Sequence, residues 1–468
     1  MSKNGKTPKP TPNSLEPAVW RELGIELDKG HQTAPWGGEL SPGMLEYAAK
    51  DARVLLALAD TLVTRAREAG LERVAEIEHR ALPAVSWMEN SGLPLDAVGW
   101  KGYLGGLERE LGILERQLDE IASGCAGGGG RNWRSAPQSK EFFEQEGFQL
   151  PNVKAETLSG VDHPVVGPLL RYRKASQLVS HFGPGLLESV REDGRVYANW
   201  HQIGAETGRM SCSGPNLQQF PPVLKDYVRA PVGRLIVAAD YSQAEVRIAA
   251  QISGDKRMLE AYGRGEDLHA TTARSLMGRE RISNEERDLA KAVNFGLLYG
   301  QGAAGLMEYA RNKYGVTMTT EEAQRYRRRF FGTYPGLKAW HEHQWRRLKQ
   351  GSTTTRTLSG RRRKGVRSFT ERVNTPIQGT GADGQKLALA LLYERRLECP
   401  GAFPIACVHD EVAVECGEDQ VAAVAAWLAR AMKDGMAEVL ALGAGSASVV
   451  PVEVEVRIGE AWGSGQPT

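Results

Sequence analysis

The sequence is poor in cysteine and contains no long apolar run. Its five cysteines include no Cys-x-x-Cys pair, which argues against a zinc ribbon or a disulfide framework and favours a reducing, cytosolic compartment. They are Cys125, Cys212, Cys399, Cys407 and Cys416. No stretch approaches the roughly 18 apolar residues of a membrane span. Residues 1–15 lack the apolar segment of a secretory signal, so we expect a short flexible tail there.

The composition is that of an ordinary globular protein, with 41% hydrophobic and 25% charged residues, which excludes a fibrous or disordered chain. At 468 residues the chain is long enough for about two to four folded units. The formal net charge is only +2, but residues 325–372 carry 15 Lys and Arg against 2 Asp and Glu, whereas the rest of the chain carries 44 against 55. The small sum therefore hides one strongly basic segment.

Helical patterns occupy the first 200 residues. Residues 16–80 look helical apart from a turn at Trp36–Gly38, and leucines recur at helical spacing between Trp100 and Ile121. Four consecutive glycines, Gly127–Gly130, follow the second pattern and predict a flexible connection. The residues alone leave open whether this connection is a functional hinge or a plain surface loop. A further helical stretch is expected over residues 164–190.

Two strand-like segments end in carboxylates. The apolar run Leu235–Ala239 ends at Asp240, and residues 405–414 read as a hairpin whose tip carries His409, Asp410 and Glu411. Two carboxylates brought together repel each other unless a cation lies between them, and oxygen ligands suit Mg²⁺. Two such ions would serve an in-line phosphoryl displacement. Acids at strand ends are more commonly solvated, so the residues alone leave both interpretations open.

A helical segment carries cations and aromatic rings in steps of four. Arg287, Lys291, Phe295 and Tyr299 share one broad face, because steps of four drift by only about 40° each around an α-helix. The cations suit a triphosphate, and the rings suit a stacked base. The alternative is an amphipathic helix whose two rings lie in the core.

Two further segments favour nucleic acid. Arg327–Arg329 and Arg361–Lys364 are interleaved with six aromatic residues, a pattern typical of phosphate binding, although a solvated basic face is the alternative. The aromatic residues are Tyr326, Phe330, Phe331, Tyr334, Trp340 and Trp345. Residues 207–211 and 215–219 carry Arg, Asn and Gln, which can donate to the minor-groove acceptors of any base pair or form an ordinary polar loop.

Together these segments resemble DNA polymerase family A, the DNA polymerase I family. Asp240–Arg247 (DYSQAEVR) and Val408–Val412 (VHDEV) are similar to its two catalytic motifs, and Arg287–Gly300 (RDLAKAVNFGLLYG) is similar to its nucleotide-binding helix. Further matches follow in family order. They are Thr207–Arg209 with Pro215–Gln218, Asp267–His269, and Asn374, Gln378 and Gly379 of an N-x-P-x-Q-G segment. The resemblance covers about residues 80–468.

The resemblance implies an α+β fold, the right-hand polymerase fold, in which an antiparallel sheet forms the palm and helices form the fingers and thumb. The regions it implies are a flexible tail at 1–15, an inactive remnant of a 3′→5′ exonuclease domain at 16–80, the thumb and connecting region at 81–200, the first part of the palm at 201–255, the fingers with the basic DNA-binding tract at 256–370, and the second part of the palm at 371–468.

The implied activity is template-directed addition of deoxynucleoside triphosphates to a primer 3′ end, with release of pyrophosphate. Asp240, Asp410 and the carbonyl of Tyr241 would hold two Mg²⁺ ions. Glu411 would lie beside these ions and help position the primer end. Lys291 would donate to the leaving pyrophosphate.

The resemblance also implies two sets of binding residues. The nucleotide-binding set comprises Gln243, Glu245, His269, Arg287, Lys291, Phe295 and Tyr299. Within it, Glu245 would block a ribose 2′-hydroxyl and so favour deoxynucleotides. The set that would track the primer terminus and the minor groove comprises Arg209, Asn216, Gln218, Asn374, Gln378 and His409.

The chain departs from the family pattern in three places. Tyr47–Asp51 resembles the last exonuclease motif, Y-x-x-x-D, but the D-x-E metal motif is missing. One carboxylate cannot hold a two-metal site, so we expect no proofreading from this chain. Thr370 stands where the family often has an arginine, and Arg372 is a candidate substitute. Glu460–Gly463 resembles the family's C-terminal end without its usual closing residues.

Two alternatives remain: a single-subunit RNA polymerase-like enzyme, and a DNA-binding protein that has lost catalysis. Glu245 and the DYSQ context argue against the first, and the intact acids and finger cations argue against the second. The expected partners are primer–template DNA and deoxynucleoside triphosphates, with a separate exonuclease or clamp subunit as a further candidate. We expect a monomer that binds no membrane and lies in the cytoplasm of a bacterial cell or a phage-infected host.

Overall fold

The structure is a computed structural model that describes residues 14–125, 130–445 and 448–467. The chain divides into two compact units, Met1–Glu76 and Ile77–Thr468. The tail expected at residues 1–15 lies almost wholly outside the described residues, and so does most of the glycine run, apart from Gly130.

The first unit is a small helical body. It contains α1 (Leu15–Leu23), α2 (Pro42–Glu68) and the first turn of α3 (Glu72–Ser91), and the predicted turn at residues 36–38 lies between α1 and α2. The side chain of Ser41 caps α2 by accepting a hydrogen bond from the amide of Met44. The core of this unit is formed by Ala18, Val19 and Leu58, with four partly buried apolar neighbours.

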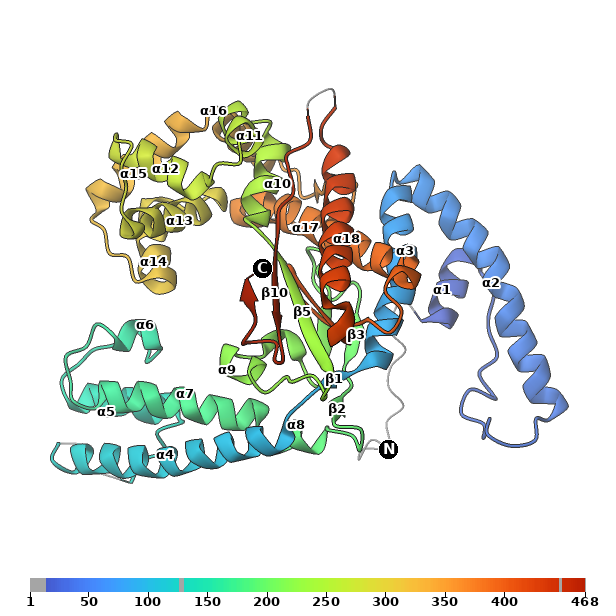
Figure 1. Ribbon diagram of the computed structural model, residues 1–468, viewed down its shortest axis with the longest axis horizontal. Helices are drawn as coiled ribbons and strands as arrows, with labels where there is room; N and C mark the ends of the chain where they lie inside the picture. Colours follow the sequence, from blue (N-terminus) through green and yellow to red (C-terminus); the bar gives the residue numbers. More distant parts are fainter. Residues whose placement is uncertain (1–13, 126–129, 446–447, 468) are drawn as a thin grey trace. The chain divides into compact units, whose positions relative to one another are not determined.

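A five-stranded antiparallel sheet lies at the centre of the second unit, in the order β11-β10-β5-β9-β8 (Figure 1). The strands are β5 (Arg234–Tyr241), β8 (Phe403–Val408), β9 (Glu411–Gly417), β10 (Val454–Gly459) and β11 (Gln466–Pro467). Residues 236–239 of β5 are all buried, as a continuous apolar run predicts for a central strand. The predicted strand and hairpin are therefore confirmed.

Two long helices, α17 (Phe369–Glu394) and α18 (Val421–Ala441), support this sheet. α18 packs on β5, β9 and β10, and α17 packs against α18. The two helices approach very closely at Gly435, where a methyl group would lie 2.5 Å from the backbone nitrogen of Ala388. A methyl group at Gly384 would lie 2.6 Å from the sulfur of Met436. Glycine is required at the first position, because a side chain would have to displace backbone.

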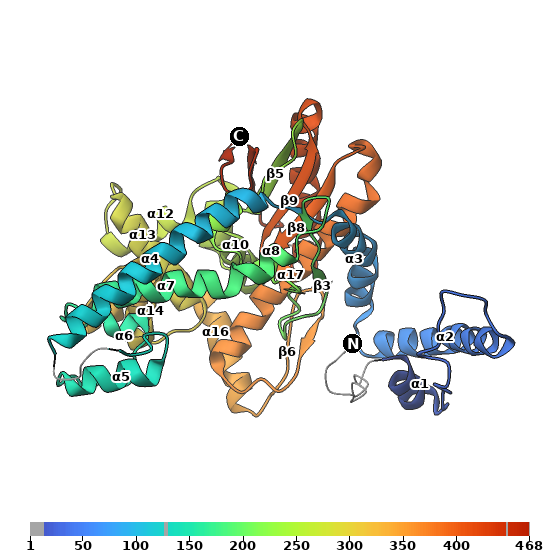
Figure 2. The same cartoon turned by 90° about the horizontal axis from the view of Figure 1, so that it is seen from below.

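Residues 97–188 form a helical arm. α4 (Ala97–Ser123) and α7 (Val166–Phe182) lie side by side (Figures 1 and 2), with α5 (Ala136–Gln145), α6 (Ala155–Leu158) and α8 (Pro184–Glu188). The predicted leucine stripe of α4 is buried; it comprises Leu104, Leu107, Leu111, Leu114 and Leu118. The short strands β1 (Leu93–Pro94) and β2 (Arg195–Val196) precede and follow the arm in the chain and pair with each other.

A second helical group follows the central strand β5 in the chain. After α10 (Ala244–Ser253) it contains α11 (Lys256–Gly263), α12 (Leu268–Met277), α13 (Asn284–Leu298), α14 (Ala303–Tyr314), α15 (Thr320–Thr333) and α16 (Pro335–Lys349). Capping boxes begin α13 and α15, with Ser283 paired to Glu286 and Thr319 to Glu322. Mixed helices with an antiparallel sheet confirm the α+β class.

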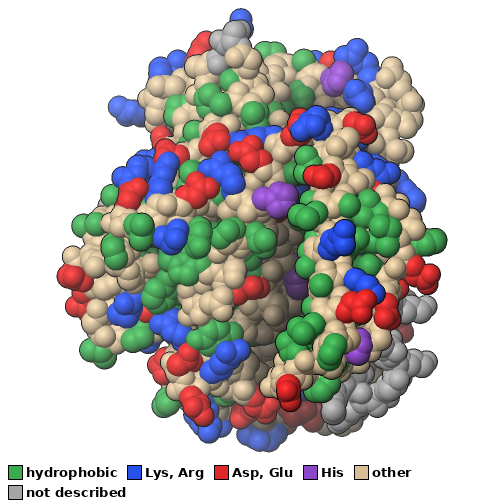
Figure 3. Space-filling model, turned by 90° about the vertical axis from the view of Figure 1, so that its right-hand side faces the viewer, with side chains coloured by type: hydrophobic (Ala, Val, Ile, Leu, Met, Phe, Trp, Pro, Cys, Tyr) green, Lys and Arg blue, Asp and Glu red, His purple; other side chains and the backbone are tan. Residues whose placement is uncertain are grey.

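Three smaller observations concern the cysteines, the helices and the surface charge. All five cysteines are free thiols. No described helix is long and apolar enough to cross a membrane. On the face drawn in Figure 3, Lys and Arg side chains are interspersed with Asp and Glu side chains, so the basic excess is not gathered there.

Candidate active site

The two predicted acids meet at one end of the central sheet. Asp240 is the penultimate residue of β5 and lies opposite Glu411 of β9 on one side and Glu455 of β10 on the other. Asp410 lies in the turn between β8 and β9, after His409, which adopts a left-handed conformation with φ 57°. Asp240, Asp410 and Glu455 line one cavity of about 490 Å³. The motifs did not point to Glu455, and only the strand register identifies it.

The electrostatics of this cavity favour a cation. Burial, followed by the charges of Asp410 and Glu411, raises the pKa of Asp240 to about 7, and burial also raises the pKa of Asp410. Oδ1 of Asp240 is buried and has no hydrogen-bond partner among the described residues. A divalent cation would satisfy this oxygen and relieve the repulsion between the acids, so the residues present fit a hard cation.

Glu411 does not point freely into the cavity. Its Oε2 lies 2.5 Å from Nζ of Lys225, and its Oε1 accepts a hydrogen bond of 2.9 Å from Nε1 of Trp462. Tyr241 also lines the cavity; its ring is buried, and its hydroxyl donates to the carbonyl of Met432 at 2.8 Å. The sequence motifs gave no signal for Lys225 or Trp462.

Most of the residues predicted on one face of α13 line the same cavity, so this part of the helix borders a cavity and not only the core. Arg287, Lys291 and Phe295 border it. Nε of Arg287 donates to Oδ2 of Asp267 at 2.5 Å. The ring of Phe295 lies 5.7 Å from that of His269 and is only partly buried. Three of the four predicted side chains are therefore available to a ligand.

The fourth, Tyr299, closes α13 and reaches Glu245. Its hydroxyl donates to Oε2 of Glu245, and Nη2 of Arg209 binds Oε1 of the same carboxylate at 2.8 Å. Burial and the charge of Glu245 raise the pKa of Tyr299 far above its ordinary value. The hydroxyl is therefore a permanent donor, and Glu245 is held in one orientation at the edge of the cavity.

His269 and Gln243 are held by a shared acid, Asp267. Oδ1 of Asp267 accepts from the amide of His269 and from Nε2 of Gln243, both at 2.9 Å. The His269 ring is 3% exposed, and its Nδ1 lies 2.7 Å from the amide nitrogen of Asn294. Burial lowers the pKa of His269 to about 4. The ring is therefore neutral near pH 7; its Nδ1 accepts from the side-chain amide of Asn294, which leaves Nε2 as the donor.

The predicted DNA-tracking residues divide into two groups. Arg209, Gln218 and His409 come together around a small crevice beside the hairpin. Nε2 of Gln218 donates to the carbonyl of Cys407 at 3.3 Å. Asn216 instead serves its own turn, since its Oδ1 accepts from the amide of Gln218.

The other two lie on α17. Oδ1 of Asn374 is buried without a hydrogen-bond partner among the described residues. The Gln378 side chain interacts with the hydroxyl of Tyr299. Gln378 is thus linked to the cavity through Tyr299 and Glu245, whereas Asn374 keeps an amide oxygen without a partner among the described residues.

Part of the basic tract is turned inward. Arg361 donates to Oδ1 of Asp383 at 2.7 Å and also binds Glu78. Lys386, with a side chain only 1% exposed, joins the same acid, Glu78. These residues form a buried ionic cluster. Their charges are neutralised inside the protein, so they cannot contribute to binding phosphates.

The expectation that Arg372 substitutes for the arginine missing at Thr370 is wrong. The Arg372 side chain is buried, and its guanidinium donates to the carbonyls of Ser352 at 2.6 Å and Thr354 at 3.2 Å. Backbone acceptors therefore hold it within the fold.

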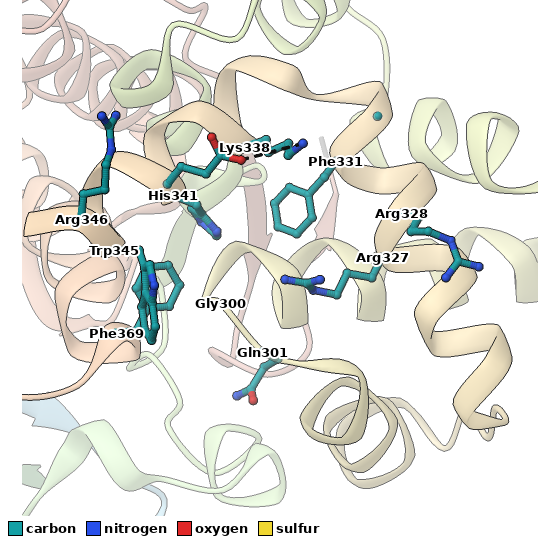
Figure 4. Close-up of a pocket in the computed structure, with 12 residues that line it drawn as sticks. Gly300, Gln301, Arg327, Arg328, Phe331, Lys338, His341, Trp345, Arg346 and Phe369 are labelled. Carbon is teal, nitrogen blue, oxygen red and sulfur yellow. Dashed lines mark ion pairs between the residues drawn. The ribbon is translucent and has the colours of Figure 1, made fainter. Parts of the chain in front are cut away.

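The outward part of the tract borders a large pocket of about 840 Å³ (Figure 4). Its cations include Arg327, Arg328 and Arg346, and its rings include Phe331, His341, Trp345 and Phe369. The rings of Trp345 and Phe369 contact each other edge to face, with centroids 5.3 Å apart. Gly300 and Gln301, which follow α13, form the opposite wall. Cations and exposed aromatic edges in one pocket suit an unpaired nucleotide and its phosphates.

A second group of metal-ligating side chains lies in the helical arm. Atoms of Cys125, Glu146 and His163 lie within 4.8 Å of one another. Nδ1 of His163 accepts from the amide of Val165 at 3.2 Å, and its Nε2 lies 3.7 Å from Glu146. An imidazole that accepts at Nδ1 carries its proton on Nε2. A metal at Nε2 would displace that proton and leave no neutral tautomer, so the geometry fits a His–Glu contact and not a metal centre.

Comparisons with known proteins point to one family. The family model described as DNA polymerase family A matches residues 132–464. The chain is 35% identical to DNA polymerase I of Aquifex aeolicus, over 96% of the chain and 81% of that protein. It is 33% identical to the thermostable DNA polymerase I of Thermus aquaticus, over 91% of the chain and 52% of that protein. The chain thus spans about half the length of the Thermus relative.

A solved structure has the same fold. It is the POL domain of Pol1 from M. smegmatis in complex with DNA primer-template and dNTP, with a TM-score of 0.78 and 26% identity, and the match covers 97% of this chain and 79% of that one. The likeness confirms the right-hand polymerase fold. With a family match over most of its length, this chain belongs to DNA polymerase family A and is a DNA-directed DNA polymerase.

Proposed function

We propose that this chain adds deoxynucleoside triphosphates to a primer 3′ end under the direction of a template, by a two-metal-ion mechanism, and releases pyrophosphate. The observation that carries the proposal is the single cavity in which Asp240 and Asp410 lie together with Arg287 and Lys291. Paired acids and paired cations bordering one space are what phosphoryl transfer from a triphosphate requires. The M. smegmatis complex with primer-template and dNTP supports the same substrate classes.

The acids of the cavity would hold the metal. Asp240, Asp410 and the carbonyl of Tyr241 supply hard oxygen donors, and the unpaired Oδ1 of Asp240 is available for a bond to a cation. Two Mg²⁺ ions bound there would lower the pKa of the primer 3′-hydroxyl and neutralise the pyrophosphate. Until a cation binds, the pKa of about 7 leaves Asp240 partly protonated near neutral pH, and burial raises the pKa of Asp410 as well.

The finger residues would bind the nucleotide. Arg287 and Lys291 would neutralise the triphosphate, and Lys291 would donate a proton to the leaving pyrophosphate. His269 would add a neutral hydrogen bond, since its pKa is near 4. Phe295 would pack on the sugar and base. Gln243 would stay a positioning residue, because Asp267 and Tyr262 already engage its amide.

Glu245 would set the sugar specificity. Arg209 and Tyr299 hold its carboxylate rigidly at the edge of the cavity. A rigid carboxylate leaves no room for a ribose 2′-hydroxyl, whereas a mobile one could swing aside. Tyr299 would also stand next to the templating base.

The DNA would lie along two surfaces. Arg209, Gln218, His409, Asn374 and Gln378 would contact the primer terminus and minor groove, while Asn216 would support their loop. The pocket bordered by Arg327 and Phe369 would take the unpaired template ahead of the cavity. In this proposal residues 81–200 form the thumb, 201–255 and 371–468 the palm, and 256–370 the fingers. Residues 16–80 would be an exonuclease remnant without proofreading activity.

Primer extension by the purified chain tests the proposal. Wild-type protein with Mg²⁺ should extend a matched primer, and Asp410→Asn should reduce the rate by at least about a thousandfold, because a carboxylate ligand of the cation is lost. Asp419→Asn makes the same chemical change on an exposed residue that follows β9 and should extend normally. Unchanged extension by Asp410→Asn would refute the metal assignment. A primer with a mismatched 3′ end should be extended without excision, and excision would overturn the remnant assignment.

A further inference from the structure

Three side chains from distant parts of the chain form a clamp around Glu411. Oε2 of Glu411 lies 2.5 Å from Nζ of Lys225, and Oε1 accepts a hydrogen bond of 2.9 Å from Nε1 of Trp462. The Lys225 ammonium also lies 4.1 Å from the centre of the Trp462 ring. Each member therefore contacts the other two. We call Lys225, Glu411 and Trp462 the Glu411 clamp.

The clamp is largely shielded from water. The side chains of Lys225 and Glu411 are 23% and 12% exposed, and Trp462 is 3% exposed. Water and salt screen an ion pair with this little exposure less than a surface pair. Removing either charge would therefore leave the other without a counterion in a poorly solvated place. Both oxygens of Glu411 are engaged, and this carboxylate is therefore not an independent metal ligand.

Backbone hydrogen bonds fix the position of Trp462. The turn after β10 is hydrogen-bonded to the end of α9 (Pro222–Lys225) and the residues that follow it. The amide of Trp462 donates to the carbonyl of Val228 at 3.0 Å, and the amide of Gly463 donates to the carbonyl of Lys225 at 3.1 Å. A methyl group at Gly463 would lie 2.1 Å from Oδ1 of Asp226. The Asp226 side chain could move away from such a methyl group, so the two backbone hydrogen bonds are what fix the indole.

The clamp acts on the part of the chain that carries the catalytic acid. Glu411 directly follows Asp410 and lies opposite Asp240 in the strand register. The preceding residue, His409, is in the left-handed region with φ 57°, which a non-glycine residue adopts only when its surroundings impose it. Fixing Glu411 on two sides is one such constraint on the tip of the hairpin.

We propose that Lys225 and Trp462 are positioning residues for DNA synthesis: they hold Glu411 away from the cation site and thereby fix the hairpin that presents Asp410. This inference rests on the proposed roles of Asp240 and Asp410 in the two-metal reaction. Neither residue lines the cavity among the described residues, so both act through Glu411. In this proposal the turn after β10 contributes to the active site, although Trp462 lies 51 positions from Glu411 in the chain.

Steady-state kinetics test the positioning role. Lys225→Met and Trp462→Phe should each lower kcat for primer extension about tenfold, because the catalytic acid loses its fixed geometry. The KM for the nucleotide should stay within about twofold, since neither side chain touches the nucleotide. Lys225→Arg keeps the charge and should recover most of the rate. Arg229→Met removes a nearby surface cation, which pairs with the exposed Glu460 at 2.7 Å, and should behave as wild type.

A double-mutant cycle tests whether the two residues act through Glu411. If they do, Lys225→Met should cost much less in a Glu411→Gln background than in the wild type, because the carboxylate it controls is gone. An equal cost in both backgrounds would overturn the proposal. Wild-type rates in both single variants would overturn it as well.

Cation binding gives a readout that does not depend on activity. Mn²⁺ binding to the DNA-free protein can be followed by electron paramagnetic resonance. Lys225→Met frees a carboxylate beside Asp240 and should bind Mn²⁺ at least about threefold more tightly, and the further change Glu411→Gln should cancel this gain. Unchanged Mn²⁺ affinity would contradict the charge-holding role. This arm also separates the two proposals: if wild-type protein fails to extend primers, the proposed function fails, while the Mn²⁺ comparison still tests the clamp. Cooperative melting of Lys225→Met and Trp462→Phe well above the assay temperature excludes unfolding as the cause of a lower rate.

Discussion

Replacing Asp240 by asparagine should stabilise the metal-free protein while abolishing DNA synthesis. The reason is the raised pKa of Asp240, which burial and the charges of Asp410 and Glu411 bring from an ordinary 3.8 to about 7. The folded state therefore holds this proton more tightly than the unfolded state does. As the pH rises from about 4 to about 7, the wild type must give up that proton and loses stability, whereas asparagine has no proton to lose.

The size of the effect follows from the same numbers. A pKa raised from 3.8 to about 7 corresponds to on the order of 4 kcal/mol, at about 1.4 kcal/mol for each factor of ten in proton affinity. The cavity is partly open to water, and screening reduces the usable share to about 2 kcal/mol. For a unit the size of Ile77–Thr468, about 1 °C of melting temperature accompanies each kcal/mol. The expected gain is therefore about 2 °C.

Thermal unfolding in the presence of a chelator measures this gain. The difference between Asp240→Asn and wild type should be small near pH 4, grow toward pH 7 and then stay constant. Added Mg²⁺ should stabilise only the wild type and remove the difference. Asp419→Asn should match the wild type throughout. Equal melting temperatures of Asp240→Asn and wild type at pH 8 would refute this account of Asp240. A difference in melting temperature that does not change with pH would refute it as well.

Three other changes follow from the structure. Arg327→Ala should weaken binding of a primer–template with a long unpaired template and lower the slope of log affinity against log salt by about one, because one phosphate contact is lost; fluorescence anisotropy at several salt concentrations measures it, and an unchanged slope would remove Arg327 from the DNA surface. Asp383→Asn should lower the free energy of unfolding by about 3–5 kcal/mol, because Arg361 and Lys386 would then share Glu78 alone and one buried positive charge would lack a counterion; urea titration that shows less than about 1 kcal/mol would contradict the buried ionic cluster. Glu245→Ala should raise the incorporation of ribonucleotides at least about tenfold relative to deoxynucleotides, and unchanged discrimination in single-nucleotide extension would remove Glu245 as the sugar filter.

The local patterns of the sequence predict much of the catalytic centre. Leu235–Ala239 is apolar without interruption, and such a run is typical of a strand buried on both faces. The hairpin behind Asp410 is visible for the same reason. On α13, the four-residue spacing indicates which face carries the cations, although only the structure shows that this face borders a cavity instead of the core.

What the sequence could not predict depends on partners that are far away in the chain. Arg361 belongs to a basic run and looks like a phosphate contact, but Glu78 and Asp383 neutralise it from two other segments. Glu455 stands beside Asp240 only because of the register between β10 and β5. Lys225 and Glu411 are 186 positions apart in the chain, and no periodic pattern of residue types predicts their contact. A run of basic residues in the sequence shows only that cations are present. Whether each side chain can reach a ligand depends on its burial and on the acids beside it in the fold.

The contact between α17 and α18 at Gly435 affects which parts of this protein open locally to solvent. Helices that touch backbone to backbone cannot slide without opening a gap, because no flexible side chain is there to fill it. Amide hydrogens along this contact should therefore exchange with solvent only when the whole unit unfolds, whereas the two-helix body at residues 15–68, with three buried core residues, should exchange by local opening. We therefore expect α17 and α18 to exchange most slowly among the described residues. Any movement that accompanies nucleotide binding is therefore expected in helices such as α12 and α13, which border the cavity, and not in α17 and α18.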